Sequence, residues 1–460
     1  MEIRIDYTNM MAAAVSGGLE ADDWREAGEA FRASRARVNE RDVRGELGFL
    51  HLPERDALRQ ACETTAGEMR PDVDDVVVLG IGGSALGPIA LRTALLEPGW
   101  NLLTRSARNG LPRLHVLDNV DPATIAGTLD RVDIARTLFI VTSKSGGTAE
   151  TMAQFLVAND RVRAAGLPVR NHFVFITDPD KGALRALAAS EGIRALEIPA
   201  DVGGRFSVLT PVGLFPAAMT GIDIGALLRG AAIMRDRCAT DVLSENPAGA
   251  YATLQWLAHT KLGKSMHVCM PYSDSLRDIA DWFVQLWAES LGKVRPDGTS
   301  VGPTPIAALG ATDQHSQVQL FMEGPADKTV SFLAVGSRSG DVEIPSAFPD
   351  VRELAYLGGH TLGALLDIEQ RATAGALARR GRPNLTITMG KVDAEHLGAL
   401  FMFFELATAY AGELYGVNAY DQPGVELGKQ FAYAMLGRPD AQAAREEWDR
   451  LPKPDPSRTI

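Results

Sequence analysis

The sequence predicts a protein of the α/β class, built on parallel sheets flanked by helices. Short β-branched runs, Gly-rich or hydroxyl-rich turns and helical stretches alternate along the chain, which is typical of repeated βα units. Of the 460 residues, 46% are hydrophobic and 23% are charged, an ordinary globular composition that excludes disorder and fibrous architecture. At roughly 150 residues per domain, this length allows two or three domains.

Charge and cysteine content indicate the class of partner and the compartment. Forty-six Lys and Arg against 58 Asp and Glu give a net charge of −12, which disfavours nucleic acid as a partner. The three cysteines have no CxxC spacing and predict neither a disulfide framework nor a thiolate zinc site (Cys62, Cys238, Cys269). The opening MEIRIDYTNMM lacks the cationic start and apolar run of an export signal. We therefore expect a cytoplasmic protein.

Elements can be predicted in chain order. Residues 18–70 are charged and Ala-rich, with apolar positions at helical spacing, and predict opening helices. The strand-like runs DVVVL, RLHVL, TLFIVT and FVFIT are each followed by a polar turn and a helical stretch. Such units predict a doubly wound parallel sheet over residues 72–200.

A second α/β series begins near residue 265. It consists of SMHVCMP, TVSFLAV and LTITMGK, each again with a helical stretch after it or nearby. The apolar stretch from Leu397 contains Glu405 and Glu413, so it predicts a buried helix and no membrane span. The Pro-rich tail RLPKPDPSRTI is expected to be loosely held.

The first Gly-rich turn, GIGGS at residues 80–84, leads into a helix expected to begin near Ala85. Converging backbone N–H groups and a helix N-terminus suit an anion. The turn also fits the dinucleotide pattern G-x-G-x-x-G/A, but no acidic residue ends a second strand about 20 residues later, and Asp118 is too distant. A dinucleotide site and a purely structural turn are the alternatives.

The third βα turn, SKSGGT from Ser143 to Thr148, combines three hydroxyls and one ammonium with a helix N-terminus. This combination predicts a cradle for a phosphate monoester. The alternative is a capped helix beside a solvated lysine. Because the carboxyl ends of parallel strands face one crevice, Ser84 could join the cradle. The sequence thus predicts a small phosphorylated ligand.

Two further motifs could act on such a ligand. In DVGGRFS, the glycine pair allows close backbone approach beside Arg205, whose guanidinium suits a developing oxyanion; a surface arginine is the alternative. Gln285 and Glu289 are spaced i, i+4 and share a helix face. Trp282 and Trp287 precede Glu289 and could raise the pKa of its carboxyl for proton transfer, although a solubilising glutamate is common.

Two polar turns complete the candidates. His315 has the most polar neighbours of the eight histidines and no metal-ligand spacing, so it predicts an acid/base group. DQPGVELGK is a tight turn and a helix that presents Lys429, although most such turns are structural.

In order, the segments GIGGSALGP, SKSGGTAET, VGGRFSVLTPVGLFPA, QLWAESLGK, GATDQHSQVQ and DQPGVELGK resemble the signature segments of the glucose-6-phosphate isomerase (phosphoglucose isomerase) family. The resemblance spans residues 7–438. It implies two sugar-isomerase (SIS) domains, each a parallel sheet flanked by helices, and a C-terminal helical arm. The implied divisions are a helical segment 1–45 packed on the second domain, domains at 46–220 and 221–415, and the arm at 416–460.

The resemblance also implies a role for each site residue. The sugar phosphate would lie on the hydroxyl and ammonium groups of five residues (Ser84, Ser143, Lys144, Ser145, Thr148). Glu289 would move a proton between C2 and C1, and Arg205 would stabilise the cis-enediolate. His315 and Lys429 would open the sugar ring. Gln285 and Gln422 would position the substrate.

The implied activity is the reversible, metal-free and cofactor-free isomerisation of glucose 6-phosphate to fructose 6-phosphate, in glycolysis and gluconeogenesis. A homodimer is implied, with His315 contributed across the interface. Gly146 and Gly147 depart from the bulkier or hydroxyl residues of many relatives but leave backbone donors for phosphate. A non-catalytic sugar-phosphate sensor and an NAD-dependent oxidoreductase are the competing hypotheses.

Overall fold

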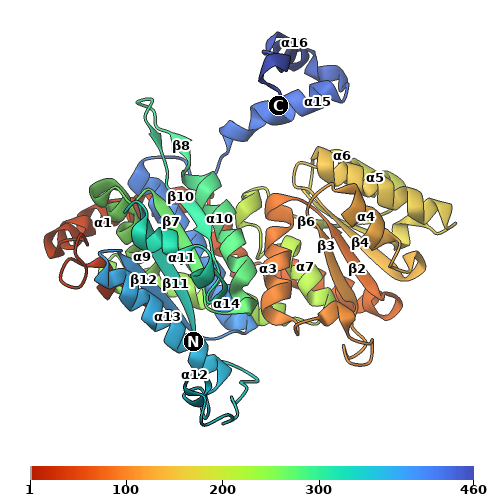
Figure 1. Ribbon diagram of the computed structural model, residues 1–460. Coiled ribbons are helices and arrows are strands. Elements are labelled where there is room, and N and C mark those ends of the chain that lie inside the picture. The colour runs from red at the N-terminus through yellow and green to blue at the C-terminus, as the bar shows by residue number, and fades with distance from the viewer. Residues whose placement is uncertain (1–2) are drawn as a thin grey trace. The chain divides into compact units, whose positions relative to one another are not determined.

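The computed structural model describes residues 3–460, which form two compact units. The first unit extends to Ala419 and contains two five-stranded sheets with helices around them (Figure 1). The second unit, Tyr420–Ile460, holds helices α15 (Glu426–Met435) and α16 (Gln442–Arg450). It confirms the expected helical arm, and every residue of the tail from 451 on is exposed.

One sheet confirms the parallel arrangement predicted for residues 72–200. Its strands are β2 (Asp75–Leu79), β3 (Arg113–Leu117), β4 (Thr137–Thr142), β5 (Phe173–Thr177) and β6 (Arg194–Glu197). All pair in parallel in the order β3-β2-β4-β5-β6. Every residue of β2, β4 and β5 is buried, which explains their continuous apolar sequence.

The other sheet confirms the second α/β series. Its strands are β1 (Ile3–Asp6), β7 (Met266–Pro271), β10 (Thr304–Ala307), β11 (Lys328–Ser337) and β12 (Asn384–Lys391). Their order is β1-β12-β11-β7-β10. β1 is antiparallel to β12, with Ile3 opposite Met389, whereas the other pairs are parallel. The segment expected to be helical at 1–45 therefore opens with an edge strand. A short hairpin joins β8 (Lys293–Val294) to β9 (Ser300–Val301).

The helices of the first unit cover the two sheets (Figure 1). They are α1 (Ala21–Val43), α2 (Asp56–Met69), α3 (Leu86–Leu95), α4 (Pro122–Leu129), α5 (Ala149–Ala164), α6 (Ala183–Glu191), α7 (Pro211–Met219), α8 (Ile224–Arg237), α9 (Pro247–Leu262), α10 (Arg277–Leu291), α11 (Val318–Glu323), α12 (Arg352–Ala355), α13 (Leu362–Arg379) and α14 (Ala394–Tyr415). The divisions implied near residues 45, 220 and 415 stay a prediction.

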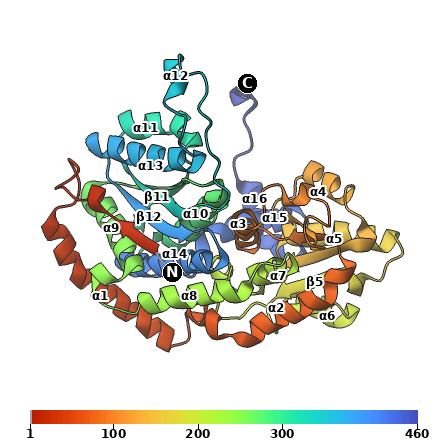
Figure 2. The ribbon, with the colours of Figure 1, turned by 90° about the horizontal axis from the view of Figure 1, so that it is seen from below.

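Helix α14 is the buried helix that the sequence predicts from Leu397. It packs against α8, α9 and α1 (Figure 2). The approach to α8 is close, because a β-carbon at Gly398 would lie 1.8 Å from the carbonyl oxygen of Leu227. Among the described helices, α14 alone is long and apolar enough to cross a membrane, yet 89% of its most apolar window is buried inside the protein. It is therefore a core helix of the first unit.

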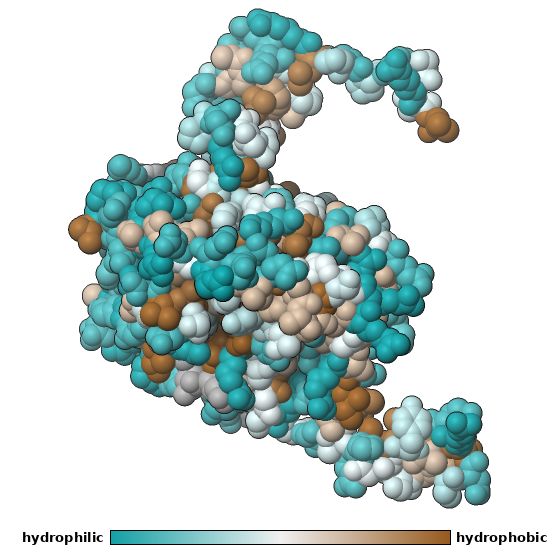
Figure 3. Space-filling model, turned by 90° about the vertical axis from the view of Figure 1, so that its left-hand side faces the viewer, coloured by the Kyte–Doolittle hydropathy of each residue, from teal (hydrophilic) through white to brown (hydrophobic). Residues whose placement is uncertain are grey.

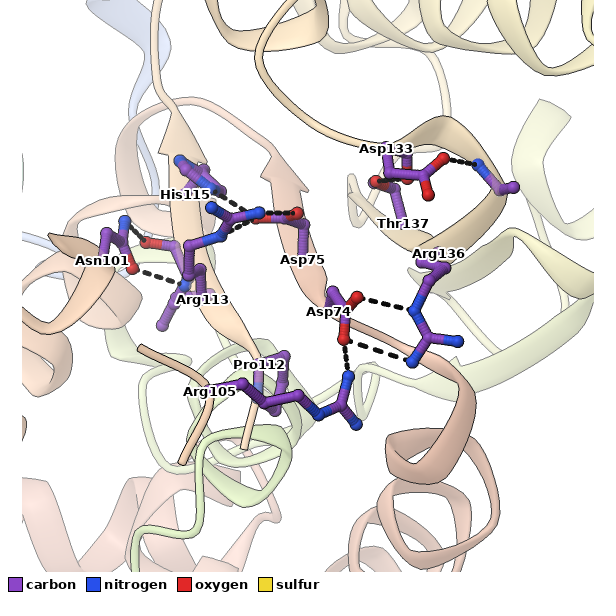
Figure 4. A network of polar contacts seen from close by, with 12 residues as sticks. Asp74, Asp75, Asn101, Arg105, Pro112, Arg113, His115, Asp133, Arg136 and Thr137 are labelled. Carbon is purple, nitrogen blue, oxygen red and sulfur yellow. Dashed lines mark hydrogen bonds and ion pairs between the residues drawn. The ribbon is translucent and has the colours of Figure 1, made fainter. Parts of the chain in front are cut away.

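An ion-pair network joins the N-terminal ends of neighbouring strands in the first sheet (Figure 4). Asp75, fully buried at the start of β2, accepts hydrogen bonds from Arg113 Nε (2.6 Å) and from the His115 ring (2.9 Å). Asp74 beside it pairs with Arg136 at 2.6 Å and with Arg105. Burial alone would raise the pKa of Asp75, but the hydrogen bonds from His115 and Arg113 outweigh burial and hold this pKa below its ordinary value.

We expect Asp75→Asn to lower the free energy of unfolding by about 3 kcal/mol at pH 7, because the change breaks a buried ion pair at constant size. The folded-state pKa of Asp75 is lowered, so its contribution is complete above the unfolded value near 3.9 and is lost as pH falls through the folded value. The difference from wild type should therefore shrink below about pH 4.

Urea unfolding curves at pH 7 and at low pH measure both effects. Asp130→Asn is the control, because Asp130 pairs with Arg161 on the surface at 3.2 Å and is 61% exposed. Equal stability of the Asp75→Asn protein and wild type at pH 7 would contradict the role given to this network.

Candidate active site

The turn after β4 gathers three hydroxyls at the N-terminus of α5. Ser143 Oγ lies 3.0 Å from Thr148 Oγ1 and 3.5 Å from Ser145 Oγ. The backbone N–H of Gly147 points to Ser145 Oγ at 3.4 Å. Thr148 is the N-cap residue of α5, but its side chain accepts no capping hydrogen bond. The hydroxyls therefore face one another instead of capping the helix, as a phosphate cradle requires.

The first Gly-rich turn lies against the segment that carries Arg205. Residues Gly82–Ser84 form a 3-10 turn, and α3 begins at Leu86, one residue after the predicted start. A β-carbon at Gly83 would lie 2.3 Å from the carbonyl oxygen of Gly204. At Gly82, where φ is +57°, it would lie 3.0 Å from Gln285 Nε2. Only glycines allow this turn to touch both segments.

Lys144 bonds to backbone carbonyls of the loop before Arg205. Its ammonium donates to the carbonyl oxygens of Ala200 at 2.9 Å and Val202 at 2.8 Å. Burial lowers the pKa of Lys144, although Asp178 and Asp201 act in the opposite direction. Lys144 therefore links the hydroxyl cradle to the arginine loop and is not the solvated lysine of the alternative reading.

Arg205 is buried, with 4% of the residue exposed, which excludes the surface-arginine alternative. Its Nε donates to Ser290 Oγ at 2.6 Å and its Nη2 donates to the carbonyl oxygen of Ala419. Its Nη1 lies 3.6 Å from Glu289 Oε2. A guanidinium held in this way stays charged and oriented next to the carboxylate.

Glu289 and Gln285 lie on one face of α10, as their spacing predicts. Gln285 Nε2 donates to Glu289 Oε2 at 3.3 Å, and a quarter of the Glu289 side chain is exposed. The two tryptophans lie in the core: Trp282 packs edge-on against Phe401, and Trp287 donates to His267 at 3.1 Å. The carboxylate of Glu289 thus faces the guanidinium of Arg205 and the amide of Gln285, and the influence expected of the two indoles stays a prediction.

His315 ends the 3-10 turn Thr312–His315 and is exposed. Its neighbours hold the turn: Asp313 accepts from the N–H of Leu309 at 2.7 Å, and Gln314 accepts from Tyr272 and from Thr373, the latter at 3.1 Å. Within residues 3–460, no hydrogen bond or ion pair joins the His315 side chain to another group. The single chain thus presents this imidazole outward and does not bond it to Glu289.

The remaining two candidates lie in the second unit. Lys429 is half exposed on α15 and pairs with Glu426 at 2.9 Å. Gln422 precedes the 3-10 turn Pro423–Val425 and is half-buried. The roles of both residues in ring opening and substrate positioning stay predictions.

Sequence reasoning missed the groups that hold Arg205. The pattern of α10 places Ser290 on its mostly apolar face, and Ser290 is indeed fully buried, but its hydroxyl accepts from the guanidinium. A lone serine among apolar positions is a signal that could have found it. The contact with Ala419 is made through its backbone carbonyl, so no side-chain pattern in the sequence could have predicted it.

The two largely parallel sheets, the three hydroxyls after β4 and the buried guanidinium 3.6 Å from a carboxylate are the features expected of a protein of the sugar-isomerase class. A family model described as phosphoglucose isomerase matches residues 54–356 and 357–452. The chain belongs to the phosphoglucose isomerase family, which confirms the resemblance seen in its motifs.

Relatives span nearly the whole chain. A glucose-6-phosphate isomerase from Carboxydothermus hydrogenoformans is 45% identical over 456 residues, covering 97% of both chains. One from Rubrobacter xylanophilus is 46% identical over 450 residues, covering 96% of this chain and all of the relative. A crystal structure of a hypothetical protein from Thermus thermophilus matches with a TM-score of 0.86 and 38% identity over 95% of this chain and all of the other.

The fold is also shared with a more distant structure. A glucose-6-phosphate isomerase from Chlamydia trachomatis matches with a TM-score of 0.73 and 24% identity, covering 86% of this chain and 77% of the other. These matches confirm the α/β class with parallel sheets and flanking helices.

Proposed function

We propose that this protein is an enzyme that interconverts glucose 6-phosphate and fructose 6-phosphate by proton transfer through a cis-enediolate. The observation that carries the proposal is the pairing of Glu289 with Arg205, whose Nη1 lies 3.6 Å from the carboxylate. A base next to a permanent buried cation can remove a proton α to a carbonyl while the cation stabilises the oxyanion that forms.

The resemblance implies the roles of the other groups, and the contacts among them support these roles. The hydroxyls of Ser84, Ser143, Ser145 and Thr148, with the charge of Lys144, bind the phosphate and fix the sugar relative to α10. Glu289 takes the proton from C2 and returns it to C1, and Gln285 orients the carboxylate through the 3.3 Å hydrogen bond. No redox cofactor is needed, because the reaction moves a proton from one substrate carbon to the next and transfers no electrons to another molecule.

Ring opening requires an acid and a base at the ring oxygen and the anomeric hydroxyl, roles that we assign to His315 and Lys429. His315 is exposed and held by its own turn, which supports its delivery to the active site of a second copy. The segment around α12 protrudes and exposes apolar side chains (Figure 3) (Val342, Phe348, Val351, Leu354, Tyr356). This exposure supports a homodimer.

A sensor that binds a sugar phosphate without chemistry would not need Glu289 and Arg205 in contact, so this alternative is not favoured. The proposed setting is the cytoplasm, in glycolysis and gluconeogenesis.

The experiment that tests the proposal is conversion of fructose 6-phosphate to glucose 6-phosphate by the purified protein with EDTA present, read as NADPH from an added dehydrogenase. We expect robust turnover under chelation. No turnover, with fructose 6-phosphate still raising the melting temperature, would contradict the isomerase and support the sensor.

A further inference from the structure

The loop that leads to Arg205 rests on a segment far away in the sequence. This supporting segment, Gly48–Arg55, comprises a 3-10 helix and the N-cap residue of α2. Loop and segment meet through backbone, charge and ring contacts, and the proposed function assigns no role to any of them.

The first contact joins the two backbones. The N–H of Gly48 donates to the carbonyl oxygen of Asp201 at 3.2 Å. A β-carbon at Gly48 would lie 2.2 Å from Asp201 Cγ, so only glycine leaves room for this carboxylate. The Asp201 side chain thus lies in close contact with the supporting segment, while a third of it stays exposed.

The second contact is a two-pronged ion pair. Arg55 donates through Nη1 to Asp201 Oδ1 at 3.0 Å and through Nη2 to Oδ2. The hydrogen bonds from Arg55 hold the pKa of Asp201 below its ordinary value. Bidentate guanidinium–carboxylate pairs fix orientation as well as distance, so this pair restrains the loop four residues before Arg205.

The third contact reaches the residue next to the guanidinium. Phe49 packs against Phe206 with ring centroids 4.9 Å apart, and the Arg205 guanidinium lies 5.7 Å from the Phe206 ring centroid. Lys144, from the turn after β4, donates to the carbonyls of Ala200 and Val202. The arginine loop is therefore restrained by two separate segments.

We propose that the Arg55–Asp201 pair positions Arg205 for the reaction, with Arg55 and Asp201 as positioning residues that touch no substrate. The inference rests on the proposed role of Arg205 at the enediolate. A guanidinium misplaced by a fraction of an ångström stabilises the developing charge less, so the pair affects kcat more than substrate binding.

The test compares Arg55→Met with Arg59→Met. Both arginines pair with carboxylates and are similarly exposed, at 28% and 29%, but among residues 3–460 the partners of Arg59 are Asp56 and Glu63 of its own helix, α2. We expect Arg55→Met to lower kcat at least about tenfold. KM and the inhibition constant of inorganic phosphate should each stay within threefold of the control. The melting temperature should stay within a few degrees of the control.

Two further variants make the test specific. Arg55→Lys keeps the charge but loses the second prong, so its kcat should lie between those of wild type and Arg55→Met. In an Arg205→Lys background, Arg55→Met should lower kcat at most about twofold. A residue that acts only by positioning the Arg205 guanidinium has no further effect once that guanidinium has been replaced.

The outcomes separate the positioning role from the proposed function. A kcat of Arg55→Met within twofold of Arg59→Met, or an equal loss in both backgrounds, overturns the positioning role. If Arg205→Lys itself keeps wild-type kcat, the proposed role of Arg205 fails instead.

Discussion

Replacing Glu289 by glutamine should lower kcat by roughly 10³- to 10⁴-fold, the upper range for a group that transfers the proton itself. Glutamine keeps the size of the side chain and can still contact Gln285 and Arg205, but it cannot accept a proton from C2. The proposed phosphate cradle, formed after β4 by Ser143, Ser145 and Thr148, is untouched. The inhibition constant of a phosphate inhibitor should therefore stay within about tenfold of wild type.

The coupled assay measures turnover, and NMR in deuterated water measures exchange of the substrate proton. Glu323→Gln is a matched control, because Glu323 on α11 accepts a hydrogen bond from Gln319 one turn earlier at 2.7 Å, as Glu289 does from Gln285. Turnover near wild type in the Glu289→Gln protein would remove Glu289 from the role of base.

Replacing Arg205 by lysine should lower kcat about 10²- to 10³-fold and raise KM much less. Arg205 donates to Ser290 and to the carbonyl of Ala419 while a third nitrogen faces Glu289. A single ammonium cannot reproduce this planar set of donors, although it keeps the charge. The loss should fall on the transition state, where the oxyanion develops.

Initial rates over a range of fructose 6-phosphate concentrations separate kcat from KM. Arg161→Lys, at an exposed pair with Asp130, controls for the exchange of arginine for lysine. A rise in KM at constant kcat would instead make Arg205 an ordinary substrate-binding group.

The sequence predicted the elements whose structure depends on a short local stretch of residues. Buried strands such as β2 and β4 are continuous apolar runs, and the turns after them carry the glycines and hydroxyls of the cradle. Strands of four residues were missed, because TPIA in β10 and RALE in β6 are too short to show a period. β1 was missed for the same reason, and its pairing with β12 is not local.

The roles of the candidate site residues stay predictions, but the structure does show which of their mutual contacts the sequence could predict. The i, i+4 spacing of Gln285 and Glu289 is a property of one helix and could be derived from the sequence. The approach of Arg205 to Glu289 depends on the packing of two distant segments. Lys144 shows the difference best: its charge suits a phosphate, but its hydrogen bonds go to carbonyls that no pattern marks.

The pairing of β1 with β12 also sets an order of assembly during synthesis. Strands β2 to β6 are consecutive, so the first sheet can form once residue 197 has left the ribosome. Ile3–Asp6 emerges earliest of the described residues, but its partner strand ends only at Lys391. Strand β1 is therefore synthesised long before its partner and must wait for it, so its placement completes this edge of the second sheet late in biogenesis.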